Sequence, residues 1–288
     1  MEKISIVTIT YNSANQIEQF LQSIWTEKEI IREIIFIENN SPEKYRTKRI
    51  YDQYKNNEFA IKSKFLINKK NNGFGKSCNK GLKISKSKYV LFLNPDTKVK
   101  KDSLKILFRH MIEKQADIIG GSCLKKDKEL HRTAIRAPNL TIGLFEFSNL
   151  GKILKINKGE EQFYYRERSM LDNKSDQSVD AVSGAYLLVR KDSFNRIGGF
   201  DEKFFMYLED VDLGVRANKA GMNVLFCPHS EIWHVGGASS RNKYKIRHQA
   251  WFDSRKYYYK KHFGLFVNLI IQPLYIIEEF LLKKLKSL

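Results

Sequence analysis

The densest group of acidic residues in the chain is Glu209, Asp210 and Asp212, within four positions of a protein whose formal net charge is +19. They follow the aromatic and apolar run FFMYL and open a helical pattern that stops at Gly221. A first helical turn favours carboxylates through its dipole and free N–H groups, which accounts for one or two of them. A carboxylate facing an apolar cleft also gains basicity, which suits a general base.

A second candidate is NPD, residues 94–96, at the end of the apolar strand pattern YVLFLN. Asp96 would stand at the rim of a sheet, beside a proline that fixes the turn. A carboxylate in that position can bind Mg²⁺ or Mn²⁺, which neutralises a diphosphate. The tripeptide equally fits a plain turn cap, and for an isolated NPD we favour that interpretation by about two to one.

His234, in EIWHVGG, follows a strand-like stretch and precedes two glycines that permit close backbone approach. A single histidine is most often structural. Here the following VGGASS favours a loop near a ligand, because glycine and serine can bring backbone N–H groups onto phosphate oxygens.

Alternating strand and helix patterns must position these residues. Apolar runs at residues 4–10, 33–38, around Phe65 and at 89–94 alternate with helical spacings, among them one after Asn12 or Ser13 and one that Asp102 would cap. Such alternation predicts an α/β fold with a doubly wound, mostly parallel sheet, Rossmann-like in its layers. The loops after Thr10, Glu38 and Leu93 should then face one crevice. Residues 125–178 show no clean period and are read as an insertion or lid.

The bulk composition predicts a folded protein with anionic partners. Lys and Arg number 51 against 32 Asp and Glu, and 42% of the 288 residues are hydrophobic. Nucleic acid, phosphorylated small molecules and an acidic membrane face all fit this charge. Three widely spaced cysteines without a paired-ligand pattern and an N-terminus without a signal pattern favour the cytoplasm.

The C-terminal segment, residues 241–288, is basic and aromatic and then apolar. Residues 241–262 carry eight Lys or Arg and six aromatic residues, which fits a single-stranded nucleic-acid channel, an acidic membrane surface or a solvated helix with an aromatic inner face. Residues 263–277 lack charge but number fifteen, fewer than the roughly 20 that a spanning helix needs. We expect this extension to lie on a membrane rather than cross it.

Six segments in order resemble the family 2 glycosyltransferases, especially their rhamnosyltransferase-like branch. They are SIVTITYN, IFIENNS, NNGFGKSCNKGL, LFLNPDT, VSGAYLLVRKDSFNRIGGFDEKFFMYLEDVDLGVRANKAG and HVGGAS, spread over residues 4–239. Each is weak alone, but the order is specific. The resemblance implies a GT-A fold in residues 1–240, with a nucleotide-binding half (1–122) and an acceptor half (179–240), followed by the helical extension at 241–288.

The resemblance also implies roles for individual residues. Asp210 would be the base, with Glu209 orienting the acceptor or the loop and Asp212 acting as a helix or supporting partner. Asp96 would bind the metal with His234 as a further ligand, and Asn94 stands where relatives carry the first acid of an Asp-x-Asp pair. The expected nucleotide-sugar site comprises Thr10, Tyr11, Asn12, Glu38, Asn40, Gly73, Phe74, Gly75, Lys76, Asn79, Asn94, Pro95 and Asp96.

The activity implied is an inverting, metal-dependent transfer of a sugar onto a hydroxyl of a glycan or lipid-linked glycan in cell-surface polysaccharide synthesis. The expected donor is dTDP-rhamnose, otherwise a UDP-hexose, with Mg²⁺ or Mn²⁺ as cofactor. We expect a cytoplasmic enzyme that binds peripherally to an anionic membrane. It would have no nucleic-acid partner, and a homo-oligomer is compatible with the sequence. Two other classes fit parts of the pattern: a nucleic-acid-binding protein, and a nucleotidyltransferase that releases pyrophosphate from a nucleoside triphosphate.

Overall fold

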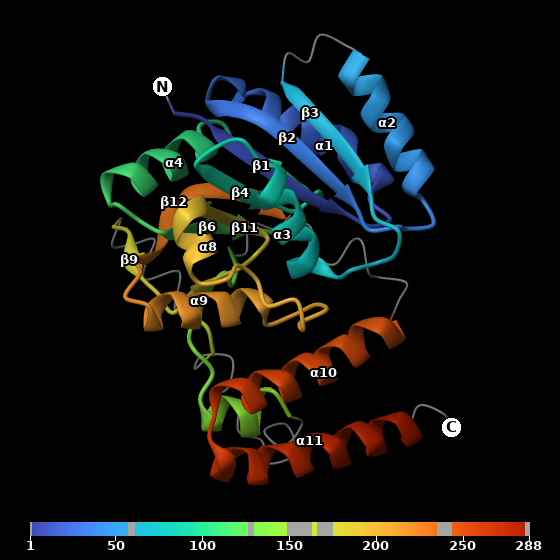
Figure 1. Ribbon diagram of the computed structural model, residues 1–288, viewed down its shortest axis with the longest axis vertical. Coiled ribbons are helices and arrows are strands. Elements are labelled where there is room, and N and C mark those ends of the chain that lie inside the picture. The colour runs from blue at the N-terminus through green and yellow to red at the C-terminus, as the bar shows by residue number, and fades with distance from the viewer. Residues whose placement is uncertain are drawn as a thin grey trace.

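The computed structural model describes residues 2–56, 61–125, 130–148, 163–165, 175–234 and 244–285. Figure 1 shows a central sheet flanked by helices, with two long C-terminal helices stacked below it. The sheet path runs β3-β2-β1-β4-β11-β6-β12-β5. The strands on this path are β1 (Ile4–Thr10), β2 (Ile31–Glu38), β3 (Lys62–Ile67), β4 (Tyr89–Leu93), β5 (Thr97–Val99), β6 (Ile118–Leu124), β11 (Tyr186–Arg190) and β12 (Val224–His234).

Short strands and helices complete the described part of the chain. β7 (Leu130–His131) pairs with β6, β9 (Gln177–Ser178) pairs with β12, and β8 (Ala134–Ile135) pairs with β10 (Ala181–Val182) in a separate ribbon. The helices are α1 (Ala14–Trp25), η1 (Lys28–Ile30), α2 (Lys44–Asn56), α3 (Phe74–Ile84), α4 (Ser103–Glu113), the π-helical η2 (Ile142–Glu146), α8 (Lys191–Arg196), α9 (Glu209–Lys219), α10 (Tyr244–His262) and α11 (Leu265–Leu285).

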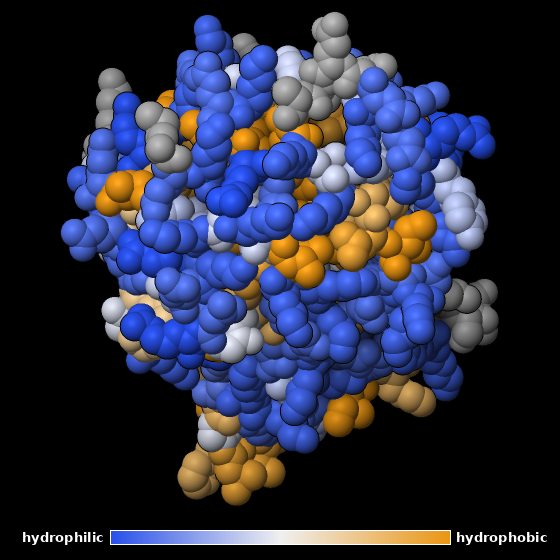
Figure 2. Space-filling model, turned by 45° about the horizontal axis from the view of Figure 1, so that its top comes forward, coloured by the Kyte–Doolittle hydropathy of each residue, from blue (hydrophilic) through white to orange (hydrophobic). Residues whose placement is uncertain are grey.

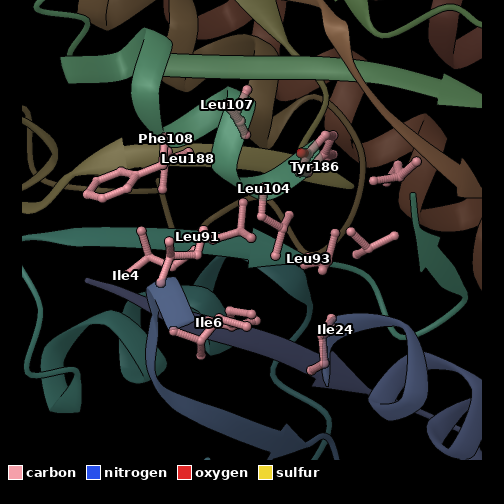
Figure 3. Close-up of a cluster of buried hydrophobic side chains, with 14 of the residues drawn as sticks. Ile4, Ile6, Ile24, Leu91, Leu93, Leu104, Leu107, Phe108, Tyr186 and Leu188 are labelled. Carbon is pink, nitrogen blue, oxygen red and sulfur yellow. The ribbon is translucent and has the colours of Figure 1, made fainter. Parts of the chain in front are cut away.

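The sheet is buried on both faces, as its near-continuous apolar strands predict. β1 pairs in parallel with β2 and β4, and β6 pairs in parallel with β12. On one face, side chains of α1 and α4 such as Phe20 and Leu107 pack against strand residues that include Ile6 and Leu91; Figure 3 shows the part of this cluster around α4. On the other face, α3, α8 and α9 cover the sheet. The predicted α/β architecture is therefore confirmed.

Antiparallel pairs make the sheet mixed rather than mostly parallel: β5 and β9 pair in this way with β12, β7 pairs so with β6, and β11 lies in the centre of the sheet. The stretch AVSGAYLLVR, expected as a single strand, is divided into β10 and β11 by a turn at residues 183–185. β11 then lies antiparallel between β4 and β6. The Asn94 N–H donates to the Ala185 carbonyl at 3.1 Å, so this turn lies directly beside the NPD segment.

The beginning of α4 corrects one predicted cap. Asp102 precedes the helix, as expected, but it adopts a left-handed conformation (φ 63°) and its side chain makes no capping hydrogen bond. The buried Glu27 carboxylate instead accepts from the backbone N–H groups of Asp102 (2.5 Å) and Lys105 (3.3 Å). A distant acid therefore satisfies the free donors of this helix.

The C-terminal helices pack on the rest of the protein through their own hydrophobic cluster. Tyr258 and Tyr259 of α10 and Ile271 and Tyr275 of α11 are buried, together with side chains from η2 and α9. The guanidinium of Arg255, 1% exposed, donates to Glu278 of α11 at 3.0 Å. α10 thus lies between α9 and α11, as Figure 1 shows.

Candidate active site

The described residues enclose a cavity of about 460 Å³ at the ends of the central strands. Residues that follow β1 and β4 and the last residue of β12 line one side of the cavity. The turn before α9, the turn before β11 and α10 line the other sides. Nine of the predicted site residues line it: Tyr11, Gly73, Phe74, Asn94, Pro95, Asp96, Glu209, Asp210 and His234. Residues more than 190 positions apart therefore meet at the crevice that the strand pattern predicts.

Asp96 and His234 form a pair on the cavity wall. Nε2 of His234 lies 3.2 Å from Oδ1 of Asp96, and the two side chains are 12% and 6% exposed. The sheet places them, since His234 ends β12 opposite Thr97 in the antiparallel pairing with β5. The loop VGGASS, expected to approach a ligand, lies outside the described residues.

This pair fits a divalent cation. A carboxylate oxygen and an imidazole nitrogen are donors that Mn²⁺ accepts, and both converge on one cavity. The amide of Asn94, which also lines the cavity, offers a neutral oxygen in place of a second acid.

The Asp210 carboxylate is held by backbone donors at the beginning of α9. Its Oδ2 accepts from the Gly184 N–H at 2.9 Å, and its Oδ1 accepts from the Val211 N–H at 2.9 Å. Burial raises the pKa of this carboxyl above its ordinary value, and the two backbone hydrogen bonds oppose that rise. A carboxylate oxygen has two lone pairs, so each can still accept a proton from the cavity side.

Glu209 lies deeper, at 6% exposure, and its buried Oε2 has no hydrogen-bond partner among the residues that the structure describes. Burial, together with the charges of Asp210 and then Asp212, raises the pKa of Glu209 well above its usual range. Two adjacent carboxyls therefore resist ionisation together, and they titrate as a pair. Such a pair, raised by burial in a cavity, is typical of a functional site.

Asp212 faces away from the cavity and binds cations. Its carboxylate is fully buried and contacts Arg216 Nε (2.8 Å), Lys261 Nζ (2.6 Å) and His262 Nε2 (2.7 Å). Burial alone would raise the pKa of Asp212, but hydrogen bonds from His262, Arg216 and Lys261 lower it below its ordinary value. The expected supporting role of this residue is thus a link between α9 and α10.

The turn before α9 is strained and is held by α10. Tyr207 and Leu208 have φ of 75° and 63°, a conformation that is unfavourable for bulky residues. Ser254 Oγ donates to the Met206 carbonyl at 2.8 Å, and Arg247 Nε donates to the Tyr207 hydroxyl at 3.1 Å. Two side chains of α10 therefore hold the backbone that aims Glu209 and Asp210.

The glycine segment before α3 meets the same turn. Gly73 has φ of 79°, and a Cβ there would lie 2.1 Å from the Phe205 carbonyl oxygen. The Phe74 N–H donates to that same oxygen at 3.0 Å. The glycine is therefore required by close packing between the N-terminal and C-terminal halves of the site, and the predicted ligand approach needs a separate test.

Seven other predicted residues do not line this cavity. Thr10 and Glu38 are buried and bond each other at 2.7 Å, and the second oxygen of Glu38 accepts from the Ser41 N–H at 2.8 Å. Gly75 packs against Phe200. The others are Asn12, Asn40, Lys76 and Asn79.

The side chains of Asn40, Lys76 and Asn79 have partners within the protein. The Asn40 amide donates to the Lys69 carbonyl (3.0 Å), Lys76 pairs with Glu202 (2.7 Å), and Asn79 exchanges hydrogen bonds with the backbone of Phe200. Asn12, at φ 52°, has its Oδ1 buried without a partner. These residues shape the loops around the cavity.

Several cavity residues were missed by sequence reasoning. Asn39 lies inside the quoted ENNS motif, and its amide donates to the Gly73 carbonyl at 2.9 Å. Arg247 and Trp251 lie in the basic aromatic segment, which drew attention for other reasons. Arg132 and Phe163 belong to the segment without a clean period, so no local signal indicated them.

A second cluster with metal-ligand chemistry lies elsewhere in the described chain. The ligand atoms of His110, Asp176 and Cys227 lie within 4.8 Å of one another, and none lines the cavity. Burial and then the charge of Asp176 raise the pKa of the Cys227 thiol to about 12. His110 Nδ1 lies 2.6 Å from an Asp176 oxygen, so these groups form an internal hydrogen-bonded network.

The fold is that of the GT-A glycosyltransferases. A mannosyltransferase from Pyrobaculum calidifontis, solved with GDP-Man and Mn²⁺, superposes with a TM-score of 0.61 at 12% identity, covering 90% of this chain and 63% of that one. GalNAc-T7, solved with UDP, GalNAc and Mn²⁺, gives 0.59 at 14% identity, over 81% and 44%. At such identities these likenesses show the fold.

The chain belongs to glycosyl transferase family 2, whose model matches residues 5–198. A model described as the N-terminal domain of galactosyltransferase matches residues 168–245. Rhamnosyltransferase WbbL of Escherichia coli is 32% identical over 59% of this chain and 63% of its own length. An N-acetylglucosaminyl-diphospho-decaprenol L-rhamnosyltransferase of Mycobacterium tuberculosis is 27% identical over 80% and 75%. The family and the resemblance to its rhamnosyltransferases are thereby confirmed.

Proposed function

We propose that the protein is an inverting glycosyltransferase that moves rhamnose from dTDP-rhamnose, or otherwise a hexose from a UDP-sugar, onto a hydroxyl of a lipid-linked glycan. One observation carries this proposal: the Asp96–His234 pair and the Asp210 carboxylate open into one cavity of about 460 Å³. A donor diphosphate and an acceptor hydroxyl need these two kinds of group on either side of one sugar. The rhamnosyl donor and the lipid-linked acceptor rest on the two relatives.

In this mechanism Asp210 is the general base. Backbone donors from Gly184 and Val211 fix its orientation, while its raised pKa makes it a better proton acceptor than an exposed aspartate. It takes the proton of the acceptor hydroxyl as the oxygen attacks the anomeric carbon. The nucleoside diphosphate departs from the opposite face, so a single displacement inverts the anomeric centre. Glu209 supports the acceptor or the turn that carries it.

Asp96 and His234 would hold the divalent metal. When bound, the ion offsets the charge that develops on the leaving diphosphate. Tyr11, Asn39 and Gly73, at the ends of β1 and β2 and before α3, form the wall on which we place the nucleotide.

The direct test measures nucleoside diphosphate release from dTDP-rhamnose and from UDP-glucose, each with Mn²⁺, with Mg²⁺ and with EDTA. We expect metal-dependent release with one donor, and its loss in Asp96→Ala, while Asp176→Ala serves as the control at the second cluster. Release of pyrophosphate from a nucleoside triphosphate, without release from either sugar donor, would instead indicate a nucleotidyltransferase.

The proposed function includes membrane contact through α11. Among the described residues, one helical segment, Leu265–Lys284, is long and apolar enough to cross a membrane, with mean hydropathy 1.7, and 17% of it is buried. The apolar helix is thus longer than the charge-free run suggested. Its exposed apolar side chains are Leu265, Phe266, Leu269, Ile270, Ile276, Ile277, Phe280 and Leu281, each more than half exposed. Figure 2 shows hydrophobic side chains gathered at the end of the molecule where α11 lies.

These exposed residues recur at helical spacing and form one stripe, while Ile271 and Tyr275 face α10. Such a stripe beside Lys283 and Lys284 suits the surface of an anionic bilayer. Phe266→Glu combined with Phe280→Glu should reduce flotation with phosphatidylglycerol vesicles. Tyr45→Glu, at a 71% exposed aromatic residue of α2, is the matched control. Equal flotation of the double variant and wild type would exclude the stripe as a membrane contact.

A further inference from the structure

Arg247 is a cation of the cavity wall that no carboxylate of the described chain neutralises. It is partly buried on α10 and lines the cavity. Nε donates to the Tyr207 hydroxyl at 3.1 Å, and the two Nη groups have no hydrogen-bond partner among the described residues. Arginine presents its N–H donors as a rigid fork, so one edge remains available to a ligand.

Three other cations of α10 are paired with acids. Arg255 pairs with Glu278 at 3.0 Å, Lys256 with Glu279 at 2.7 Å, and Lys261 with Asp201 at 2.7 Å. These pairs attach α10 to α11 and to the segment before α9. Arg247 contacts the segment before α9 only through the neutral Tyr207 hydroxyl, forms no ion pair with a carboxylate of the described residues, and lines the cavity.

Trp251 lies one helical turn after Arg247 and lines the same cavity. Its ring centroid is 6.0 Å from that of Tyr207, in an edge-to-face contact. Arg247, Trp251 and Tyr207 thus form one stretch of the cavity wall, with a cationic group beside two aromatic side chains. Tyr207 precedes Glu209 by two residues, so this wall adjoins the proposed base and lies on the acceptor side of the cavity.

We infer that Arg247 and Trp251 form an acceptor subsite that binds a sugar carried on a diphosphate, with the guanidinium on the phosphate oxygens. The inference rests on the proposed function and narrows its acceptor. Guanidinium binds phosphate through paired charge-assisted hydrogen bonds, and an aromatic wall accepts an apolar chain. α10 also packs on α11, so the subsite and the exposed apolar stripe belong to one helical hairpin. A lipid-linked diphosphate can occupy both.

The test measures binding of geranyl diphosphate by calorimetry to the full chain, with the donor pocket filled by saturating nucleoside diphosphate and Mn²⁺. Arg247→Gln should weaken binding about tenfold or more, since it removes hydrogen bonds to a charged group. Arg247→Lys keeps the charge and loses the fork, so it should bind more weakly than wild type and more tightly than Arg247→Gln. Lys260→Ala, which removes an exposed charge from the same helix, should match wild type. Geraniol should bind far more weakly than its diphosphate.

Any of three results would overturn the inference: no binding of geranyl diphosphate by wild type, equal affinities of wild type and Arg247→Gln, or geraniol binding as tightly as the diphosphate. Inorganic pyrophosphate as a further arm shows how much of the affinity belongs to the phosphates alone; affinity equal to that of geranyl diphosphate would remove the lipid from the proposal. Melting curves of each variant establish that it is folded.

The Tyr207→Phe variant distinguishes a purely structural role of Arg247 from a role in binding the diphosphate. This change removes the hydrogen bond to the turn and keeps the guanidinium, so geranyl diphosphate should still bind. A loss equal to that of Arg247→Gln would assign Arg247 to holding the turn. Donor turnover is assayed independently of geranyl diphosphate binding. If the protein hydrolyses dTDP-rhamnose but Arg247→Gln binds geranyl diphosphate as tightly as wild type, the subsite alone is refuted. A protein that needs Arg247 for diphosphate binding and turns over no sugar donor refutes the proposed function alone.

Discussion

Carboxylates on the two sides of the first turn of α9 differ in the direction of their pKa shifts and in their partners. On the cavity side, burial raises the pKa values of Glu209 and Asp210, and no cation pairs with either among the described residues. On the side of α10, Asp212 is fully buried, yet hydrogen bonds from His262, Arg216 and Lys261 lower its pKa. Acidic residues within four positions therefore have opposite pKa shifts, and the presence or absence of basic partners decides the direction.

The largest expected effect tests the reactive side. Asp210→Asn keeps the shape of the side chain but removes its basicity, so transfer should fall about 10²–10⁴-fold. Nucleotide affinity, measured by calorimetry with Mn²⁺, should remain near that of wild type because the donor wall is unchanged. Unaltered turnover in this variant would exclude Asp210 as the base.

The next effect tests the attached side. Asp212→Asn leaves Arg216, Lys261 and His262 without their common anion, and breaking a buried pair typically destabilises by about 3–5 kcal/mol. Urea denaturation should report a loss of this order. Asp253→Asn, at a 60% exposed residue 3.5 Å from Lys256, is the control and should change stability by less than about 1 kcal/mol. Comparable losses in the two variants would contradict a special role for Asp212.

Glu209→Gln should have the opposite sign. The folded pKa of Glu209 is raised, so ionisation above the ordinary pKa of 4.5 opposes folding, and this penalty is absent below it. At neutral pH the variant should therefore be more stable than wild type, because the amide carries no charge that burial disfavours. The difference should vanish as pH falls towards 4.

Asp212→Asn supplies the counterpart to that pH series. Its folded pKa is lowered, so the stability it contributes is present above its ordinary pKa of 3.8 and is lost as pH falls through the folded pKa. The two variants should therefore differ from wild type in opposite directions at neutral pH and converge with it in acid. Curves of the same sign would show that the two sides of the turn are electrostatically alike.

The smallest expected effect measures the contribution of His262 to the contacts of Asp212. His262→Gln removes one of three contacts to Asp212 and retains a hydrogen-bond donor, so a loss of about 1 kcal/mol is expected. Thermal unfolding at neutral pH measures it. A loss as large as that of Asp212→Asn would mean that His262, rather than the lysine and arginine, neutralises the buried acid.

Much of the site could be predicted because strand ends carry it. Asp96 lies three residues after β4 and His234 ends β12, and parallel strands of a doubly wound sheet bring such ends together. The local sequence pattern could not predict whether a polar side chain at a strand end contacts a ligand or another residue of the protein. Glu38 follows the same logic, yet Thr10 and Ser41 already occupy its oxygens. That outcome depends on which side chains meet across the sheet.

The C-terminal helices were the least predictable part of the site. The basic aromatic composition of α10 fitted three environments equally, and the structure buries Tyr258 and Tyr259 while pairing Arg255, Lys256 and Lys261 with acids. This packing favours a helix with an aromatic inner face over a nucleic-acid channel. The cap of α4 was likewise not predictable from local sequence. The expected residue was Asp102, but the acid that accepts from the first N–H groups is Glu27, 75 positions away.

The consecutive positive φ angles at Tyr207 and Leu208 indicate that the C-terminal helices are needed to hold the turn before α9. An isolated turn of this sequence would relax towards ordinary backbone angles, and the tethers from Ser254 and Arg247 prevent it. A fragment trimmed to the sheet and its covering helices would keep every strand end but lose these two contacts, so we expect Glu209 and Asp210 to be poorly oriented in it. Under the proposed function, shortening or exchanging the carboxyl-terminal hairpin should therefore lower turnover, as a change in the cavity itself would.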